Sequence, residues 1–143
     1  MTTITRSALV MHSAEQMFDL VNDVRRYPEF LQGCQATEVI SEGDDFIEAR
    51  LTIAMAGVKQ SFATRNSLER PVRMEMQLVD GPFSKFEGIW RFQALSPEAC
   101  KVSLDMEFEV ANRITGVALG AVFKQVANMM VDAFVKRAKN VYG

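Results

Sequence analysis

The chain has 143 residues, of which 48% are hydrophobic and 24% charged. This composition is that of one globular domain and excludes wholesale disorder or a fibrous protein. The 18 acidic and 16 basic residues give a net charge of −2, whereas a protein that mainly grips nucleic-acid phosphates is expected to be basic. DNA is therefore not an expected partner. Two cysteines and one histidine are too few for a disulfide framework or a four-ligand zinc site.

The first elements expected along the chain are a strand and two short helices. Residues 4–11 form the strand, and Ser13 with Gln16 forms a capping box that starts the first helix. Residues 27–31 predict a second short helix, with Pro28 in its first turn. The buried side of the first helix is expected to contain Met17, Leu20, Val21 and Val24.

From about residue 35 to residue 110 the hydrophobic pattern changes to a period of two. Apolar residues alternate with polar and charged ones in several segments, which short turns rich in glycine and proline separate. Such alternation is typical of an antiparallel sheet with one buried and one solvent-exposed face. The polar residues on the buried side of these predicted strands are neutral: Gln60, Thr64 and Asn66.

Residues 112–142 are expected to form one long helix. At about 1.5 Å per residue it would be about 45 Å long, enough to cross a whole sheet. The compact arrangement is a curved antiparallel sheet wrapped around this helix, because each apolar face then covers the other. The expected fold class is α+β, in a single domain of residues 1–143. The apolar stripe of the helix contains Leu119, Phe123, Val126, Met130, Ala133, Phe134 and Val141.

The sequence offers little for catalysis. It has no glycine-rich nucleotide-binding motif, and its one histidine, His12, follows the first strand at a helix entrance, where a surface role is commoner. Acidic and basic residues within the strands fall on the solvent-exposed side, so no titratable group is placed on the concave side for acid–base chemistry. Asp80, in a loop, is the most plausible acid that remains. We expect the protein not to be an enzyme and to require no cofactor.

The concave side of the predicted sheet is apolar and rich in methionine. Thioether side chains are flexible and suit irregular or adaptable apolar surfaces. Two interpretations therefore remain open: simple filling of the core, or a pocket for a lipid or a quinone. Leu104 and Phe134 are expected in the space between sheet and helix. The pocket itself would be lined by Phe62, Met74, Met76, Trp90, Phe92, Met106, Phe123 and Met130.

The start of the long helix has a second feature. Residues 114–121 are apolar nearly all round and include Gly116 and Gly120, although glycine inside a helix costs about 1 kcal/mol relative to alanine. Close packing against the sheet and a flexible, apolar mouth of the cavity both explain the pair, and both remain open. The expected entrance for a hydrophobic ligand consists of Tyr27, Pro28, Phe30, Leu31, Val117 and Ala121.

Four motifs occur in order over almost the whole chain. They are Tyr27-Pro28-Glu29-Phe30-Leu31, Asp80-Gly81-Pro82-Phe83, Gly88-Ile89-Trp90-Arg91-Phe92 and the ending at residues 133–143. These motifs resemble the coenzyme Q-binding START-like family, which is grouped with polyketide cyclase/dehydrase-like proteins. The resemblance implies the helix-grip fold, in which a curved antiparallel sheet grips a long C-terminal helix and encloses an elongated cavity. Many members have Pro-Trp-Cys where this chain has Gln32-Gly33-Cys34, so a large aromatic residue near the entrance is missing.

The resemblance implies two functions from different classes. The first is non-catalytic binding of ubiquinone, as a carrier or chaperone that supports respiratory electron transport, with peripheral contact to the inner membrane. The second is that of bacterial ribosome-association toxins in the same family, which bind the large (50S) ribosomal subunit and block assembly of the 70S ribosome. The N-terminus has no basic region followed by an apolar run, so no signal peptide is expected and the cytoplasm is the expected location.

Charge bears on the second of these functions in two ways. The net charge of −2 argues against binding to a ribosome. Local basic clusters argue for it, although such clusters also occur on ordinary solvated surfaces. The clusters are Arg65, Arg70 and Arg73, and Lys136, Arg137 and Lys139.

Overall fold

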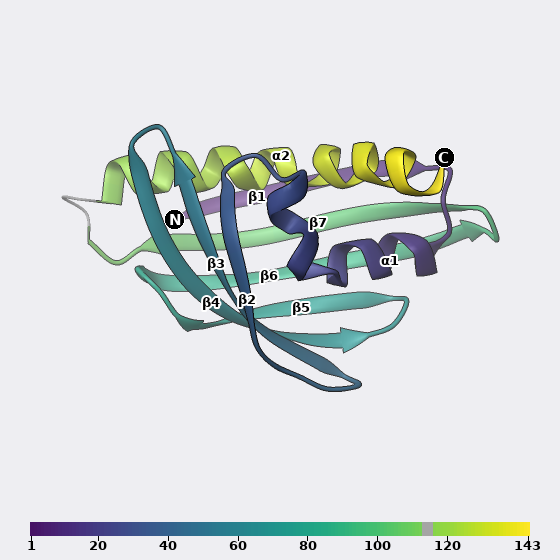
Figure 1. The fold of residues 1–143 in the computed structure, drawn as a ribbon, viewed down its shortest axis with the longest axis horizontal. Helices are drawn as coiled ribbons and strands as arrows, with labels where there is room; N and C mark the ends of the chain where they lie inside the picture. The colour runs from purple at the N-terminus through teal and green to yellow at the C-terminus, as the bar shows by residue number, and fades with distance from the viewer. Residues whose placement is uncertain (113–115) are drawn as a thin grey trace.

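Seven antiparallel strands form one sheet in the computed structural model of the chain, which describes residues 1–112 and 116–143 (Figure 1). The strands are β1 (Thr2–Val10), β2 (Cys34–Glu42), β3 (Phe46–Met55), β4 (Val58–Glu69), β5 (Arg73–Asp80), β6 (Phe83–Ser96) and β7 (Ala99–Val110). The helices are α1 (Ala14–Asn22), the 3-10 helix η1 (Val24–Glu29) and α2 (Gly116–Tyr142).

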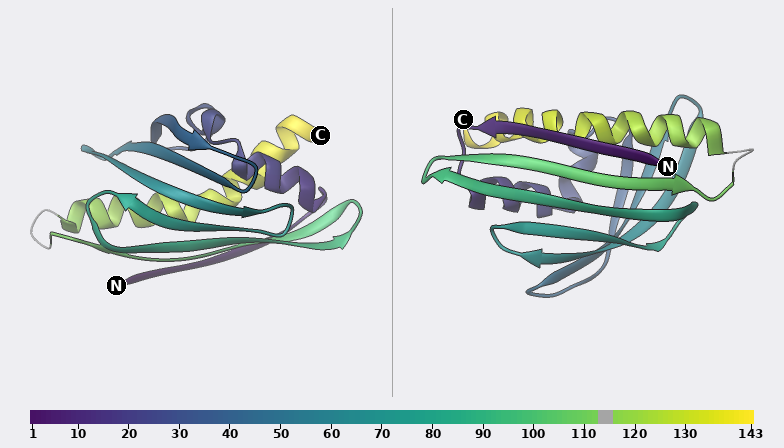
Figure 2. Two further views of the ribbon diagram at one scale, coloured as in Figure 1. Left: turned by 90° about the horizontal axis from the view of Figure 1, so that it is seen from below. Right: turned by 180° about the vertical axis from the view of Figure 1, so that it is seen from behind.

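The strand order is β1-β7-β6-β5-β4-β3-β2, so neighbouring strands follow one another in sequence except for β1 and β7. This pair places the first strand beside the last, with Thr2 opposite Phe108 and Val10 opposite Cys100. The sheet curves, and α2, α1 and η1 lie on one side of it (Figure 2). The expected α+β class and helix-grip arrangement are confirmed.

The predicted alternation of side chains along the strands is confirmed. Trp90 on β6 is 1% exposed and faces the helices, whereas its neighbour Arg91 is exposed on the outer face. The even-numbered residues of β7 face inward and are buried, because side chains of a strand alternate between the two faces. These are Cys100, Val102, Leu104, Met106 and Phe108.

Part of β4 departs from strict alternation. Pairing with β5 changes from Ala63–Asp80 to Thr64–Leu78, which leaves Val79 as a bulge. Around this irregularity residues 62–64 are all buried. Gln60, expected on the buried side, is exposed because it lies close to the β3–β4 turn.

The two short helices have different bounds from those predicted. The capping box is confirmed: the Gln16 backbone N–H donates to Ser13 Oγ (3.1 Å), and the Ser13 N–H donates to Gln16 Oε1 (3.0 Å). Helix α1 then ends at Asn22, because Asp23 has non-helical backbone angles. The second helix is a 3-10 helix that starts at residue 24, so Pro28 lies near its end and not in its first turn.

Helix α2 packs its apolar side against the concave face of the sheet. Its expected start at residue 112 is wrong, since Asn112 is not helical, and residue 114 lies outside the described residues. Val141, expected in the apolar stripe, is exposed in the last turn. By length and composition α2 could also cross a membrane, which for a single helix is weak evidence, and here its apolar side packs against the sheet. The buried stripe includes Leu119, Phe123, Val126, Met130 and Phe134.

Candidate functional site: an internal apolar cavity

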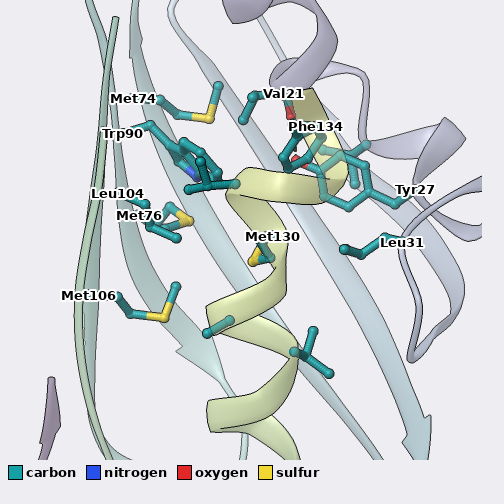
Figure 3. Packing of buried hydrophobic residues seen from close by; sticks show 14 of the residues in the cluster. Val21, Tyr27, Leu31, Met74, Met76, Trp90, Leu104, Met106, Met130 and Phe134 are labelled. Carbon is teal, nitrogen blue, oxygen red and sulfur yellow. Dashed lines mark hydrogen bonds between the residues drawn. The ribbon is translucent and has the colours of Figure 1, made fainter. Parts of the chain in front are cut away.

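A small cavity lies between the concave face of the sheet and α2. Its volume is about 50 Å³, and side chains of η1, of β3 to β7 and of α2 form its walls. Figure 3 shows the sulfur-containing side chains of the sheet facing Met130 on α2. The lining residues are Val24, Tyr27, Leu31, Ala49, Leu51, Ile53, Phe62, Thr64, Asn66, Met74, Met76, Phe86, Trp90, Met106, Phe123, Val126, Ala127 and Met130.

The structure places every side chain predicted for the pocket on this cavity except Phe92. Phe92 is buried, but its ring packs edge-on against Phe18 of α1, with 5.4 Å between ring centroids. The reason is that α1, and not α2, covers this end of β6. Alternation along a strand marks the buried side but not which helix covers each position. The prediction also missed several wall residues, because alternation and helical phase show that a residue is buried but not that it lines the cavity. These residues are Ala49, Leu51, Ile53, Phe86 and Val126.

A glycine on the neighbouring strand makes room for the Met76 side chain on the wall. Met76, Gly88 and Met106 lie opposite one another on β5, β6 and β7. A Cβ at Gly88 would lie 2.5 Å from Met76 Cε, so the Met76 thioether occupies the room that the glycine leaves. Because methionine is unbranched and flexible, this wall can change shape without moving the backbone.

Two neutral polar side chains face the cavity from β4. Thr64 Oγ1 donates to Asn66 Oδ1 (3.1 Å), and Asn66 Nδ2 lies 3.7 Å from Met74 Sδ. A thioether is a weak acceptor, so this amide group has unused capacity to donate. No charged side chain lines the cavity in the described part of the chain, and residues 1–112 and 116–143 contain no group of three or more His, Cys, Asp or Glu side chains placed to hold a metal. The described wall is apolar apart from the Thr64–Asn66 pair and the Tyr27 hydroxyl, which is bonded to the Val21 carbonyl.

Of the predicted entrance residues on the η1 side, two belong to the core. Tyr27 and Leu31 are buried and line the cavity. The Tyr27 hydroxyl donates to the Val21 carbonyl, and burial raises the pKa of Tyr27 far above its usual value. Phe30 is half-buried, with its ring edge-on to Phe134 at 5.3 Å, whereas Pro28 is exposed. Pro28 and Phe30 do not line the cavity.

The predicted entrance residues on α2 do not reach the cavity. Val117 is 76% exposed and Ala121 is also exposed, because both lie on the side of α2 that faces away from the sheet. The structure therefore does not bring them together with Tyr27 and Leu31 on the cavity wall, and their role as an entrance stays a prediction. At Gly116 a Cβ would lie 2.6 Å from Val110 Cγ1, which favours close packing against β7 as the reason for this glycine.

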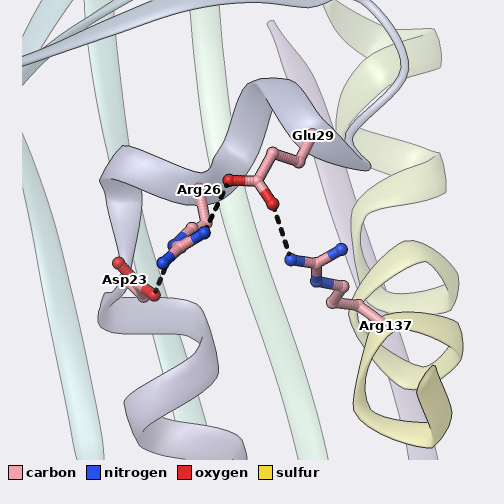
Figure 4. Close-up of polar contacts among 4 residues, drawn as sticks. All are labelled: Asp23, Arg26, Glu29 and Arg137. Carbon is pink, nitrogen blue, oxygen red and sulfur yellow. Dashed lines mark hydrogen bonds and ion pairs between the residues drawn. The ribbon is translucent and has the colours of Figure 1, made fainter. Parts of the chain in front are cut away.

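Polar contacts on the surface tie η1 to α2 beside the cavity (Figure 4). Glu29 accepts from Arg26 Nη1 (3.1 Å) and from Arg137 Nη2 (3.0 Å), and these hydrogen bonds lower the pKa of the Glu29 carboxyl. The Arg137 guanidinium also lies 5.0 Å from the centre of the Phe30 ring. These contacts join η1 to α2 at the surface next to the Tyr27 side of the cavity.

Comparison with known proteins agrees with this architecture. Residues 10–135 match the family model described as "Polyketide cyclase / dehydrase and lipid transport". The chain is 48% identical to the Pseudomonas aeruginosa protein named "Ribosome association toxin RatA", over 99% of both chains. It is 29% identical to the Xenopus laevis protein named "Coenzyme Q-binding protein COQ10 homolog B, mitochondrial", over 97% of this chain and 59% of that protein.

A solved structure shows the same fold at low sequence identity. The Zhui aromatase/cyclase from Streptomyces superposes with a TM-score of 0.85 at 19% identity, covering 99% of this chain and 96% of that one. At this identity the likeness concerns the fold alone. The assignment of the chain to a family rests on the family model, which matches most of the chain. The chain therefore belongs to the polyketide cyclase/dehydrase and lipid-transport family, in its START-like helix-grip form.

Proposed function

We propose that this chain associates with the ribosome, binding the large (50S) subunit and keeping it from joining the small subunit in the 70S ribosome. The observation that carries the proposal is the close identity, along almost the full length of both chains, to a relative named as a ribosome association toxin. The quinone function, placed first from the sequence, now stands second, because the coenzyme Q-binding relative is much more distant and the chain spans only part of it.

The size and lining of the cavity support this order. Pockets that hold organic ligands usually measure about 300–1,000 Å³, and a cavity of about 150 Å³ is known to admit benzene. The cavity here is about 50 Å³, and among the described residues no charged side chain lies on its wall. A function performed by the outer surface requires neither a larger cavity nor a catalytic group, so we propose that the protein is not an enzyme and acts in the cytoplasm.

A ribosome profile tests the proposal. The chain is overproduced in a bacterial host, and the lysate is separated on a sucrose gradient. We expect the 70S peak to fall, the free subunit peaks to rise, and the protein to sediment with the 50S fractions. The strain carrying an empty vector is the control. An unchanged profile with the protein at the top of the gradient would contradict the proposal.

Binding of a hydrophobic ligand, with ubiquinone as the first candidate, is the second proposed function. The observation that favours it is the polar pair on the cavity wall. Among the described residues Asn66 Nδ2 has the Met74 thioether as its one acceptor, and it would bind a quinone carbonyl more strongly. The flexible methionines would have to move to admit a ring. A carrier with this role would also contact the inner membrane.

Extraction of the purified protein tests this second function. Organic extraction and native mass spectrometry are expected to detect a bound quinone in the wild type. The double variant T64V/N66L keeps the shape of the wall but removes its polar pair, so bound quinone should be lost. The matched control is T52V/S61A, which removes another side-chain pair (2.9 Å) between β3 and β4, away from the cavity. Absence of quinone from the wild type, or equal loss in both variants, would count against this function.

A further inference from the structure

Basic side chains fall into two groups in the described part of the chain. Most of them lie within 4.0 Å of a carboxylate, as in Arg25–Glu42 (2.8 Å), Arg70–Asp19 (2.8 Å) and Lys85–Glu107 (3.1 Å). A smaller group has no carboxylate partner among residues 1–112 and 116–143. Its members are Arg6, Lys59, Lys101, Lys124, Lys136 and Lys139.

Most of these unpaired cations lie on one side of the molecule. Lys124, Lys136 and Lys139 are on the exposed side of α2, and Arg6 is on β1, which runs beside α2 (Figure 2). Arg6 Nε donates to Asn128 Oδ1 of α2 (3.1 Å), which joins the two elements into one surface. We call this surface the α2 face; it consists of Arg6, Lys124, Gln125, Asn128, Asp132, Lys136, Lys139 and Asn140.

The α2 face differs in charge from the rest of the molecule. Helix α2 carries four basic residues and one acidic residue, although the chain as a whole has a net charge of −2. On the outer face of the sheet, by contrast, a depression is lined by the carboxylates of Glu75, Glu87, Asp105 and Glu107. These four carboxylates are in ion pairs with Arg73, Lys85 and Arg91, so they largely offset neighbouring cations and leave no unpaired basic group there. A polyanion would therefore be attracted to the α2 face, whose cations have no carboxylate partner among the described residues.

We infer that the α2 face docks on the phosphate backbone of ribosomal RNA, an inference that rests on the proposed ribosome association. Lysine and arginine side chains without an internal partner can neutralise phosphates without first breaking an ion pair. Between them Gln125, Asn128 and Asn140 supply amides, which commonly hydrogen-bond to phosphate and sugar oxygens. Exposed apolar side chains, Val117 (76% exposed) and Ala121, also lie on the outer side of α2, as they do on a helix that binds a membrane. The amides favour RNA over a membrane, and binding to vesicles is therefore one arm of the test.

The test compares two charge-reversal pairs in binding to purified 50S subunits. K124E/K136E changes the α2 face, and K59E/K101E makes the same change in net charge at exposed, unpaired lysines elsewhere. We expect K124E/K136E to weaken co-sedimentation at least about tenfold, and its affinity to fall less steeply with salt, because each lost phosphate contact lowers the slope by about 0.7–0.9. The control pair should stay within about twofold of the wild type, since it makes no phosphate contact.

A third variant tests the same surface in the opposite direction. Asp132 is the one acidic residue of the α2 face, and it is exposed. D132N removes its repulsion of phosphates and should strengthen binding to the 50S subunit by about twofold or more. Within residues 1–112 and 116–143 Asp132 forms no hydrogen bond or ion pair that the variant would delete. A gain in binding therefore supports docking through this face, and unchanged binding counts against it.

The outcomes separate the inference from the function on which it rests. If the wild type does not co-sediment with 50S subunits, both fall. If the wild type binds and the two lysine pairs lose affinity equally, or not at all, the ribosome function stands and docking through the α2 face is wrong. If K124E/K136E binds 50S subunits normally but loses binding to phosphatidylglycerol vesicles, the face serves a membrane and the inference is overturned.

Discussion

The space between the sheet and α2 is filled in two different ways. Toward the start of α2, phenylalanine rings pack closely, with Phe123 at 4.7 Å from Phe108 and 5.0 Å from Phe83. Toward the middle of the helix, Met130 faces Met74, Met76 and Met106 (Figure 3). The cavity lies among these methionines and reaches the near edge of the ring cluster, since Phe62, Phe86 and Phe123 also line it. The same sheet and the same helix form both regions, so the difference lies in the side chains alone.

This difference shows how one core can be fixed at one end and adaptable at the other. A phenylalanine ring has few rotatable bonds, and edge-on contacts between rings add about 0.5–1.5 kcal/mol beyond the burial of area. A thioether chain has more rotamers and makes less specific contacts. We therefore expect the phenylalanine end to dominate stability and the methionine end to tolerate changes of shape.

The largest effect is expected from F123A. Phe123 contacts four other rings, those of Phe62, Phe83, Phe86 and Phe108, and its loss should lower the free energy of unfolding by about 3–5 kcal/mol. Urea unfolding measures the change. F46A is the control, because Phe46 is only half-buried and lies under the Arg65 guanidinium on the outer face. Similar losses in both variants would contradict a dominant ring cluster.

A smaller loss in the free energy of unfolding is expected when the pH is raised. Burial raises the pKa of the Cys34 thiol from 9.0 to about 11, and the Tyr27 hydroxyl on the cavity wall is raised too. In the unfolded chain these groups ionise first, so the free energy of unfolding should fall as pH rises from about 9 to about 11. At about 1.4 kcal/mol per pKa unit, Cys34 contributes up to about 2.5 kcal/mol of this fall.

Substitution of Cys34 separates its contribution to this pH dependence from that of other ionising groups. C34A should show a shallower decline in the free energy of unfolding over the same pH range, whereas C100A, which removes a thiol on β7, should change it less. Urea titrations at several pH values measure this. A wild-type free energy of unfolding that stays constant between about pH 9 and pH 11 would contradict this prediction, because Cys34 and Tyr27 would then ionise equally well in the folded and unfolded chain.

Two neighbouring residues of β7 compare the regions directly. Met106 and Phe108 both face inward and are buried, but only Met106 lines the cavity. M106L conserves volume and should cost less than about 1.5 kcal/mol. F108L removes the edge-on contacts with Phe83 and Phe123 and should cost at least about 1 kcal/mol more. Equal losses in thermal and urea unfolding would erase the distinction between the two regions.

Most of the fold could be predicted from the sequence because its patterns are local. The period of two, the Ser13–Gln16 capping box and the apolar stripe of α2 each reflect neighbouring residues only. The bounds of α1 and η1 could not be predicted, since they depend on the backbone angles of Asp23. The bulge at Val79 depends on pairing between two strands, which no single segment encodes.

The candidate site was predictable only in part. Alternation and helical phase identified inward-facing residues such as Met76 and Trp90. They could not show that α1 covers Phe92, or that Arg137 of α2 bonds to Glu29 of η1, because these contacts join distant parts of the chain. The size of the cavity was also beyond prediction, since it depends on which rotamers the methionines adopt.

The smallest effect is expected on the outer face of the sheet, which both core regions share. Arg91 and Asp105 form an ion pair there (3.0 Å), and about half of each side chain is exposed. Exposed pairs contribute little because water screens the charges and both side chains lose rotamer freedom. R91A and D105A should each change the free energy of unfolding by less than about 1 kcal/mol, and added salt should not alter this result. A loss in the free energy of unfolding as large as that of F108L would mean that the sheet surface stabilises the fold as much as the ring cluster does. The contrast between the two core regions would then no longer explain which substitutions the protein tolerates.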